Sequence, residues 1–384
     1  MKKYLNYTLL FLLVASISCS RSTKETGNRY DYDLIISEKK LEIPIDSLTP
    51  FESTCIKGFQ ENDRSYLVFL NSNFSKIDFY NLENQSLYKR IHLKNDGPNG
   101  VGRRVFGFEV FSMDSIFLSS SNMNLNLINS DGEVLDKIPY ININEGIGLL
   151  QITSTYNKNL AFKNGLVYGY TGLVGDPSGW DQNQLSKWNI EVQIDPSTKG
   201  IKLLPITYPN DYFQEGIKNW ELSRIYDGKK FIYSFCADHY LYSTTDFSTI
   251  TKTLAKSDYF EKISSMSKNI GISEYQKYLI ENPSYKSLVY DKYREVYYRF
   301  CDLATEFNEN DNVEKIIKYR PKQSIVILDK DLKKIGEKLL PEKSFKLDNY
   351  FIVREGLYIS NNTPFNKDMS EDVLSFTLFT LTQI

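Results

Sequence analysis

The sequence predicts an all-β protein: a six-bladed β-propeller whose N-terminal strand closes the last blade, with one short helical insert. Three observations lead to this fold class. A short apolar segment recurs six times, each copy is followed by a further strand, and the sixth copy lacks the outer strand that the other five have. The composition agrees with the prediction, because 28 Tyr and 23 Phe residues favour strands.

The recurring segment is a strand of apolar residues that opens at a polar or glycine turn. Its starts lie about 50 to 65 residues apart, which is close to one blade per repeat in a propeller with ordinary loops. Because a missed repeat would give the wrong fold, this spacing is the strongest single indication of a propeller. The six copies are 64–70, 114–119, 164–169, 228–233, 294–299 and 355–360.

A second series follows the first and consists of a strand, an Asp- or Asn-bearing turn, and another strand. These turn residues accept the dihedral angles of a hairpin at little cost, so each copy predicts an antiparallel pair. The five complete copies are 76–80 with 86–91, 124–128 with 133–135, 190–194 with 201–204, 240–242 with 250–254, and 324–328 with 333–340.

The sixth copy is incomplete and predicts how the ring closes. Residues 374–381 alternate as a strand, and the sequence ends at Ile384 without an outer strand. Residues 41–45 form a strand-like run ahead of the first blade and would supply it. A ring closed in this way leaves no open sheet edge between its two ends. The alternative interpretation is a sandwich of unrelated strands.

We therefore expect a single propeller over residues 39–384. A helical insert is expected at 257–282, where apolar residues recur three and four apart, Ser273 could cap the helix and Pro283 would end it. The expected blades are approximately 52–93, 104–140, 150–208, 219–256, 284–341, and 344–384 together with strand 41–45.

The N-terminus has the form of a secretion signal. Residues 1–18 combine two lysines with an apolar run too short to span a bilayer comfortably, and Cys19 follows directly. This arrangement resembles a bacterial lipobox, although Ser16 stands where leucine is usual. The prediction is a signal peptide over 1–18, a lipidated Cys19, and a flexible tether over 19–38. The alternative is an ordinary signal peptide with an incidental cysteine.

Two local segments carry a resemblance to a known group of proteins. Residues 94–102, KNDGPNGVG, follow the first blade, and residues 290–299, YDKYREVYYR, open the fifth. Together with the lipobox-like start, they resemble exported six-bladed propeller lipoproteins of unknown function, which are similar to TolB-like propellers. The resemblance covers nearly the whole mature chain. It implies the fold and export, and it implies no reaction.

Charge and motifs exclude several functions. The chain has 46 basic and 48 acidic residues, so it lacks the basic surface that a nucleic-acid partner requires. Cys236 and Cys301 occupy matching places in adjacent blades, too far apart for a disulfide, and are expected to be buried. No spaced His or Cys pair suggests a metal, and no cofactor motif is present. An oxygen-rich run at 306–312 lacks the glycine of a calcium loop and is interpreted as a solvated loop.

A ligand site in a propeller would lie at the central channel or on the inter-blade loops. Long loops with aromatic and charged residues are the natural candidates, since these residue types dominate binding hot spots. For each of them, an exposed loop residue or an inter-blade ion pair is the alternative. The ligand-binding candidates are Arg103, Arg104, Asp176, Trp180, Asp238, His239 and Arg299.

The function predicted from the sequence is a cell-envelope lipoprotein that serves as a binding or scaffold propeller for a protein, peptide or glycan partner. No catalytic residue is assigned, and an enzyme is the less favoured class. The alternative is a hydrolase or lyase acting on a glycan or lactone, which predicts carboxylates converging with a metal or a histidine in the channel mouth. Membrane attachment through Cys19 is expected at the outer membrane, facing the periplasm.

Overall fold

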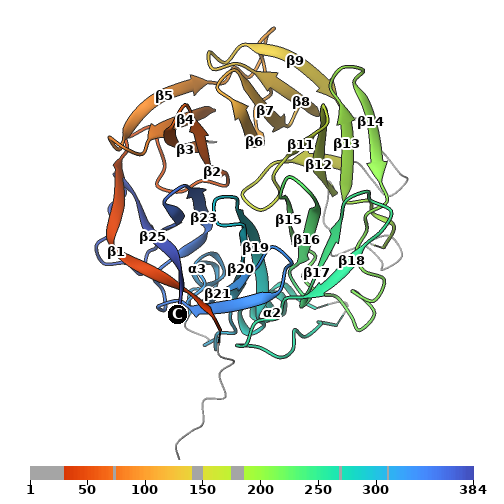
Figure 1. The fold of residues 1–384 in the computed structure, drawn as a ribbon, viewed down its shortest axis with the longest axis vertical. Helices are drawn as coiled ribbons and strands as arrows, with labels where there is room; N and C mark the ends of the chain where they lie inside the picture. Colours follow the sequence, from red (N-terminus) through yellow and green to blue (C-terminus); the bar gives the residue numbers. More distant parts are fainter. Residues whose placement is uncertain (1–29, 72–74, 141–149, 174–185, 268–269, 309–310) are drawn as a thin grey trace, which may run out of the picture.

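The computed structural model describes residues 30–71, 75–140, 150–173, 186–267, 270–308 and 311–384. Within them, the strands form six antiparallel sheets arranged radially around a central axis (Figure 1). The predicted fold class, a six-bladed β-propeller, is confirmed.

Each of the first three blades runs from an inner strand to an outer strand. Blade three differs from the others because two short strands, β10 and β11, share its inner position and both pair with β12. The bounds are β2 (Ile56–Glu61), β3 (Arg64–Asn71), β4 (Lys76–Asn81) and β5 (Ser86–His92); β6 (Val105–Ser112), β7 (Ser115–Ser120), β8 (Asn124–Ile128) and β9 (Val134–Pro139); and β10 (Leu150–Thr153), β11 (Ala161–Lys163), β12 (Leu166–Leu173), β13 (Glu191–Asp195) and β14 (Gly200–Leu204).

The last three blades repeat this order, except that the outer strand of blade six comes from the N-terminus. The bounds are β15 (Leu222–Tyr226), β16 (Phe231–Phe235), β17 (Tyr240–Thr244) and β18 (Thr251–Leu254); β19 (Ser284–Asp291), β20 (Val296–Asp302), β21 (Gln323–Leu328) and β22 (Lys334–Leu339); and β23 (Lys346–Val353), β24 (Gly356–Ser360), β25 (Val373–Gln383) and β1 (Tyr32–Pro44).

Strand β1 closes the ring by pairing antiparallel with β25, from Tyr32 opposite Gln383 to Pro44 opposite Val373. The closing strand is therefore longer than the predicted 41–45. The tether predicted for 19–38 is wrong at its C-terminal end, because residues 32–38 belong to β1. The physical reason is burial. Leu34, in the first half of β1, is fully buried against neighbouring strands, and so is Ile43 further along the same strand.

In the described part of the chain, helices α2 and α3 lie outside the sheets. Helix α2 (Ile272–Glu281) falls within the predicted insert, but it begins before Ser273, and Gly271 is its N-cap residue. The Gly271 amide donates to the Glu274 carboxylate at 3.1 Å. Helix α3 (Val313–Lys318) was not predicted from the sequence; Asn312, in the oxygen-rich run, caps it by accepting a hydrogen bond from the Lys315 amide at 2.9 Å.

The recurring apolar segment corresponds to the second strand of each blade, and burial explains its composition. Every residue of β20 and of β21 is buried, because neighbouring blades cover both faces of the central strands. The outer strand β5, by contrast, is largely exposed. The prediction that Cys236 and Cys301 are buried is confirmed, and both are free thiols.

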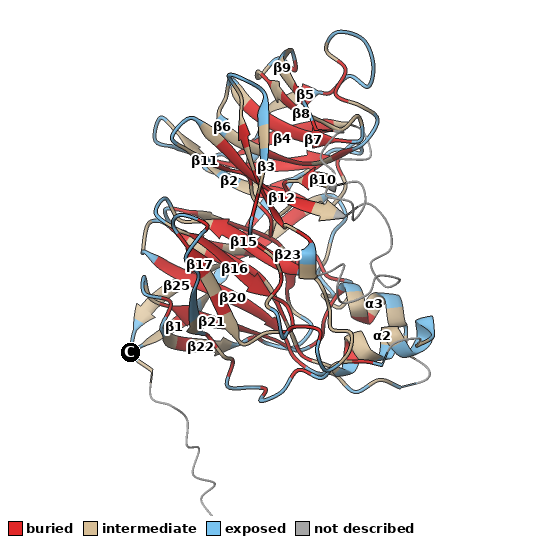
Figure 2. Cartoon of the chain, turned by 90° about the vertical axis from the view of Figure 1, so that its right-hand side faces the viewer, coloured by how far each residue is buried: buried red, intermediate tan, exposed pale blue. Residues whose placement is uncertain are grey.

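The ring has two different faces. The turn face carries the turns between the first and second strands of the blades, at 62–63, 113–114, 164–165, 227–230, 292–295 and 354–355. The helix face carries α2 and α3. Figure 2 shows the two helices on one side of the ring and the C-terminus on the other side.

Candidate functional site

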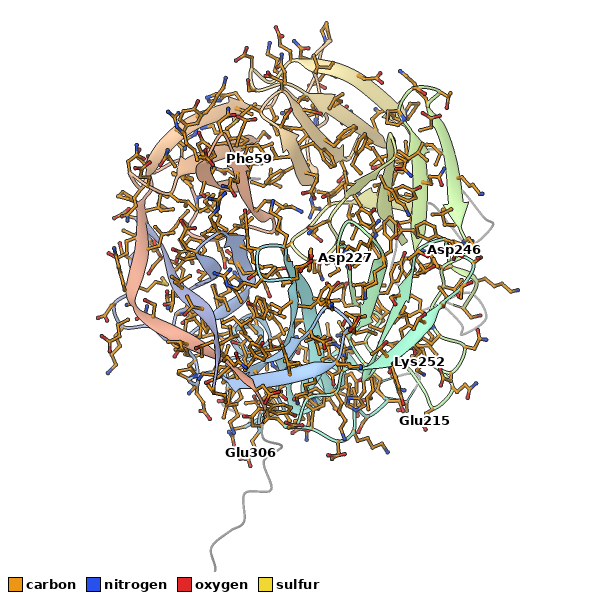
Figure 3. The ribbon with its side chains drawn as sticks, in the orientation of Figure 1. Phe59, Glu215, Asp227, Asp246, Lys252 and Glu306 are labelled. Carbon is orange, nitrogen blue, oxygen red and sulfur yellow. The ribbon has the colours of Figure 1, made fainter. Side chains whose placement is uncertain are left out.

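A cavity of about 340 Å³ occupies the channel at the turn face, and all six blades contribute to its wall. It lies at the Tyr290 end of β19, whereas α2 lies ahead of the beginning of that strand. Figure 3 shows Asp227, next to the lining residue Tyr226, near the middle of the ring, and Asp246 and Lys252 farther out. The lining includes Lys57, Gly58, Glu109, Phe111, Tyr156, Asn159, Phe162, Tyr226, Tyr290, Tyr293, Tyr350 and Ile352.

A loop that interrupts the inner strand of blade three brings several of these side chains to the channel. The loop, residues 154–160, joins β10 to β11 and is held by its neighbours on both sides. The Ser154 hydroxyl donates to the Phe108 carbonyl of blade two at 3.0 Å. The Asn157 side chain donates to the Leu222 carbonyl of blade four at 3.2 Å, and the Asn157 carbonyl accepts from the Arg224 amide at 2.8 Å. Because hydrogen bonds hold the loop to blade two and to blade four, Tyr156 and Asn159 have fixed positions in the wall.

The polar part of the wall is an ion pair with an amide beside it. The Lys57 ammonium group lies 2.8 Å from a Glu109 carboxylate oxygen and also donates to the Asn159 side-chain oxygen. The Lys57 and Glu109 side chains are only 10% and 17% exposed. These three side chains form one connected polar group, and each comes from a different blade. Lys57 lies on β2, Glu109 on β6 and Asn159 on the blade-three loop.

Aromatic rings form the rim of the cavity. Phe111 and Phe162 are both exposed, and their ring centroids are 5.5 Å apart. Tyr226 stacks on Phe231 at 4.5 Å, and Tyr290 lies 5.0 Å from Tyr297. Exposed aromatic side chains at a concave site are a typical feature of ligand-binding pockets.

Two tyrosines close the inner end of the cavity. The Tyr156 and Tyr350 rings meet edge to face at 6.3 Å, and the Tyr350 hydroxyl donates to the Tyr156 carbonyl at 2.6 Å. Burial raises the pKa of the Tyr156 phenol well above its usual value, and the Asp348 and Glu221 carboxylates add to this shift. Tyr156 is therefore a neutral hydroxyl at physiological pH.

A buried ion pair behind the wall supports the blade-three loop. The Arg224 and Glu191 side chains have no exposed surface, and the Arg224 Nε donates to Glu191 Oε2 at 2.6 Å. The Tyr233 hydroxyl donates to the same oxygen at 2.9 Å. Another nitrogen of the guanidinium group donates to the Asn159 carbonyl. The pair thus fixes the backbone of a residue that lines the cavity.

Arg299, a predicted ligand-binding residue, is placed inside the protein. Its side chain has no exposed surface, and the guanidinium group lies 3.3 Å from the centroid of the Tyr285 ring. Its N–H groups donate hydrogen bonds to the Ser234 hydroxyl and to the carbonyls of Phe235, Asp238, His239 and Ala255. Arg299 joins blade five to the loops of blade four and leaves no donor for a ligand.

Asp238 and His239 belong to the same internal network. The Asp238 carboxylate accepts from the Tyr242 hydroxyl at 2.6 Å. The His239 Nδ1 lies 2.7 Å from the Tyr285 hydroxyl, and its Nε2 lies 3.1 Å from the Glu261 carbonyl. Burial lowers the pKa of His239, so the ring is neutral at pH 7. Both residues stabilise the loop between β16 and β17, away from the cavity.

The remaining predicted residues also lie away from the cavity or outside the described part of the chain. Arg103 and Arg104 are exposed ahead of β6, at the opposite end of that strand from Glu109 and Phe111. Asp176 and Trp180 lie outside the described residues.

The lining residues share a position that the sequence could have revealed. Phe111, Phe162, Tyr226 and Tyr290 all precede the turn between the first and second strands of their blade by one or two residues. Extending each recurring segment backwards across its turn would have located the inner strands and these aromatic residues. Tyr156 and Asn159 have no such signal, because an interrupted strand has no repeat partner.

The fold and the cavity define the class of protein: a six-bladed β-propeller with a pocket to which all six blades contribute. The chain belongs to the family described as a domain of unknown function, DUF4221, whose model matches residues 32–339. The crystal structure of a member of this family from Bacteroides vulgatus is 28% identical, covers 93% of this chain and 100% of its own, and has a TM-score of 0.81. The predicted resemblance to propellers of unknown function is confirmed.

Distant propeller enzymes also resemble this chain. Luciferin-regenerating enzyme is 10% identical over 90% of this chain and 96% of its own, with a TM-score of 0.45. Virginiamycin B lyase from Staphylococcus aureus is 13% identical over 92% of this chain and 100% of its own, with a TM-score of 0.41. At these scores neither carries an argument about function. No curated protein matches the chain.

Proposed function

We propose that this protein is a binding propeller of the cell envelope, which takes its ligand into the turn-face cavity and performs no chemistry on it. One observation carries the proposal: a single concave site draws wall residues from all six blades and combines an aromatic rim with one fixed polar group. Pockets that bind small molecules or parts of larger ones have this composition.

The residues of the cavity favour binding over hydrolysis or elimination. Glu109 is the one carboxylate among its described lining residues, and it is held by Lys57 rather than poised against a second acid. Elsewhere in the described ranges, no group of three or more His, Cys, Asp or Glu side chains could hold a metal. His239 lies in the blade-four network. The convergent carboxylates that the enzyme alternative requires are therefore not present among the residues that the structure describes.

The binding role predicts that the aromatic rim is required for affinity. We expect the double substitution Phe111→Ala and Phe162→Ala to abolish the rise in melting temperature that a ligand produces, because the exposed faces of both rings are lost. At a ligand concentration of 100 Kd the rise for the unaltered protein should be about 4 °C. The measurement is a thermal-shift screen of the chain from Ser20 onward, with neutral trisaccharides, charged trisaccharides and tripeptides as probes.

Tyr88→Ala is the matched control, because Tyr88 is an equally exposed aromatic residue on the outer strand β5. Tyr88→Ala should leave the ligand-induced shift unchanged. The proposal fails if none of the probes raises the melting temperature, or if the shift persists in the double variant.

Attachment to the membrane is part of the same proposal. The cysteine that follows the apolar N-terminal run supports it, and none of the described helices is long and apolar enough to cross a bilayer. We expect Cys19→Ala to move the protein from the membrane fraction to the soluble fraction of the cells that export it, because the lipid supplies the membrane affinity. Equal membrane retention of the altered and unaltered proteins on detergent-free fractionation would exclude anchoring through Cys19.

A further inference from the structure

We propose that the turn-face cavity binds a neutral saccharide, with one sugar ring inside the cavity and the neighbouring ring against the aromatic rim. This inference rests on the proposed binding function and names the chemical class of its ligand. Four features of the described residues support it: the charge balance of the wall, its unused hydrogen-bonding atoms, the exposed aromatic faces and the volume.

The enclosed part of the cavity wall is electrically balanced, because its only charged groups among the described lining residues are one ammonium and one carboxylate. Lys57 and Glu109 neutralise each other at 2.8 Å, and both are largely buried. The other charged lining residue, Lys292, is exposed and lies 5.2 Å from the Tyr293 ring centroid at the rim. A charged group that enters the cavity and pairs with Lys57 or Glu109 would have to break a largely desolvated ion pair, and uncoupling such a pair is costly. A neutral polar ligand can add hydrogen bonds to the pair and leave it intact.

The polar group formed by Lys57, Glu109 and Asn159 still has an unused donor and an unused acceptor. Among the described residues, Asn159 Nδ2 has no hydrogen-bond partner, and neither does Glu109 Oε1. The Tyr290 hydroxyl also has no hydrogen-bond partner among the described residues. A sugar hydroxyl is both donor and acceptor. Neighbouring hydroxyls could therefore donate to Glu109 and accept from Asn159.

The aromatic rim provides flat apolar faces beside these polar atoms. Phe111 is 37% exposed and Phe162 48% exposed, although both are large apolar side chains that usually gain from burial. The faces of aromatic rings carry partial negative charge, so the C–H groups on one side of a sugar ring interact favourably with them. A saccharide presents C–H groups on the face of its ring and hydroxyl groups around its edge. An aromatic surface next to hydrogen-bond donors and acceptors therefore matches it.

The volume limits how much of the ligand can enter. The cavity of about 340 Å³ lies at the lower end of the ~300–1,000 Å³ that is usual for small-molecule pockets. One monosaccharide unit fits this space, and a longer chain must continue past Phe111 and Phe162. An apolar peptide side chain of similar size would leave Asn159 Nδ2 and Glu109 Oε1 without partners after water is displaced, which costs affinity.

The test is isothermal titration calorimetry on the chain from Ser20 onward with three probe sets: neutral trisaccharides, the corresponding uronic-acid or amino-sugar trisaccharides, and tripeptides. We expect a neutral trisaccharide to bind at least tenfold more tightly than its charged counterpart. Asn159→Ala should weaken this binding about three- to tenfold, because one hydrogen bond is lost.

Two further variants distinguish a loss of binding contacts from a folding defect. Tyr290→Phe removes a hydroxyl that makes no bond in the described structure, so it should fold normally and still weaken the saccharide about two- to fivefold. Asn95→Ala, at an exposed turn residue outside the channel, should change nothing.

Two results would overturn the inference. If tripeptides bind and depend on Phe111 and Phe162 while neutral saccharides do not bind, the saccharide inference is wrong and the binding function stands. If no probe set binds, both are wrong.

Discussion

A chain that begins at Asp46, and so lacks β1, is expected not to form a stable closed ring. Strand β1 pairs with β25 along its length and buries Leu34, Leu41 and Ile43. Burying each such side chain stabilises a protein by about 1.5–3 kcal/mol, so the three together contribute about 5–9 kcal/mol. That is a large part of the ~5–15 kcal/mol by which a typical domain is stable. The deletion also exposes the edge of β25, which can then pair with another chain.

The measurement is urea unfolding and gel filtration of chains that begin at Ser20 and at Asp46. A point variant tests the same strand without deleting it: Ile43→Ala should cost about 2–5 kcal/mol, because it leaves a cavity in the core. Ile35→Ala is its control, since Ile35 on the same strand is 53% exposed and should cost far less. A monomeric Asp46 chain with an unchanged urea midpoint would show that β1 does not hold the ring closed.

Glu191→Gln is expected to destabilise the protein by about 3–5 kcal/mol, because it leaves the Arg224 charge buried without a counter-ion. Neither side chain has exposed surface, and the Tyr233 hydroxyl also loses its charged acceptor. The same guanidinium group holds the Asn159 carbonyl. The substitution should therefore loosen the cavity wall as well as lower the free energy of unfolding.

Urea unfolding of Glu191→Gln should be compared with that of Glu281→Gln. Glu281 forms an exposed pair with Lys277 on α2, with 3.8 Å between the charged atoms, and such pairs are worth at most about 0.5 kcal/mol. Similar losses in the two variants would mean that the buried pair contributes no more than a surface pair and does not organise blades three and four.

The middle strands of the blades could be predicted because their signals are local. In β20, neighbouring blades cover both faces, so nearly every side chain is apolar and the run stands out in the sequence. The hairpin turns that follow are marked by Asp and Asn. The closing strand was found for a different reason, since a repeat with one strand missing requires that strand elsewhere. Only its length was underestimated, because the polar residues near Ile35 on the exposed side of β1 resemble a tether.

The inner strands and the site could not be predicted in the same way. Inner strands face the channel, so they mix charged, aromatic and glycine residues, as in Lys57, Gly58 and Phe59 of β2, and show no simple alternation. The predicted ligand residues followed residue type alone. Arg299 has the right type, but its place in the second strand of a blade puts it between two sheets, where the Ser234 hydroxyl and four carbonyl groups accept from all its donors.

The sequence by itself determined the all-β class, the number of blades and the way in which the ring closes, and it predicts export. The class and the number of blades follow from short-range patterns, in which turn residues and apolar runs reflect the burial of neighbouring positions, and the ring closure follows from comparing the repeats. The tertiary structure alone decided which polar residues meet. Lys57, Glu109 and Asn159 are separated by about fifty residues from one to the next, and they touch because consecutive blades place their inner strands around one axis.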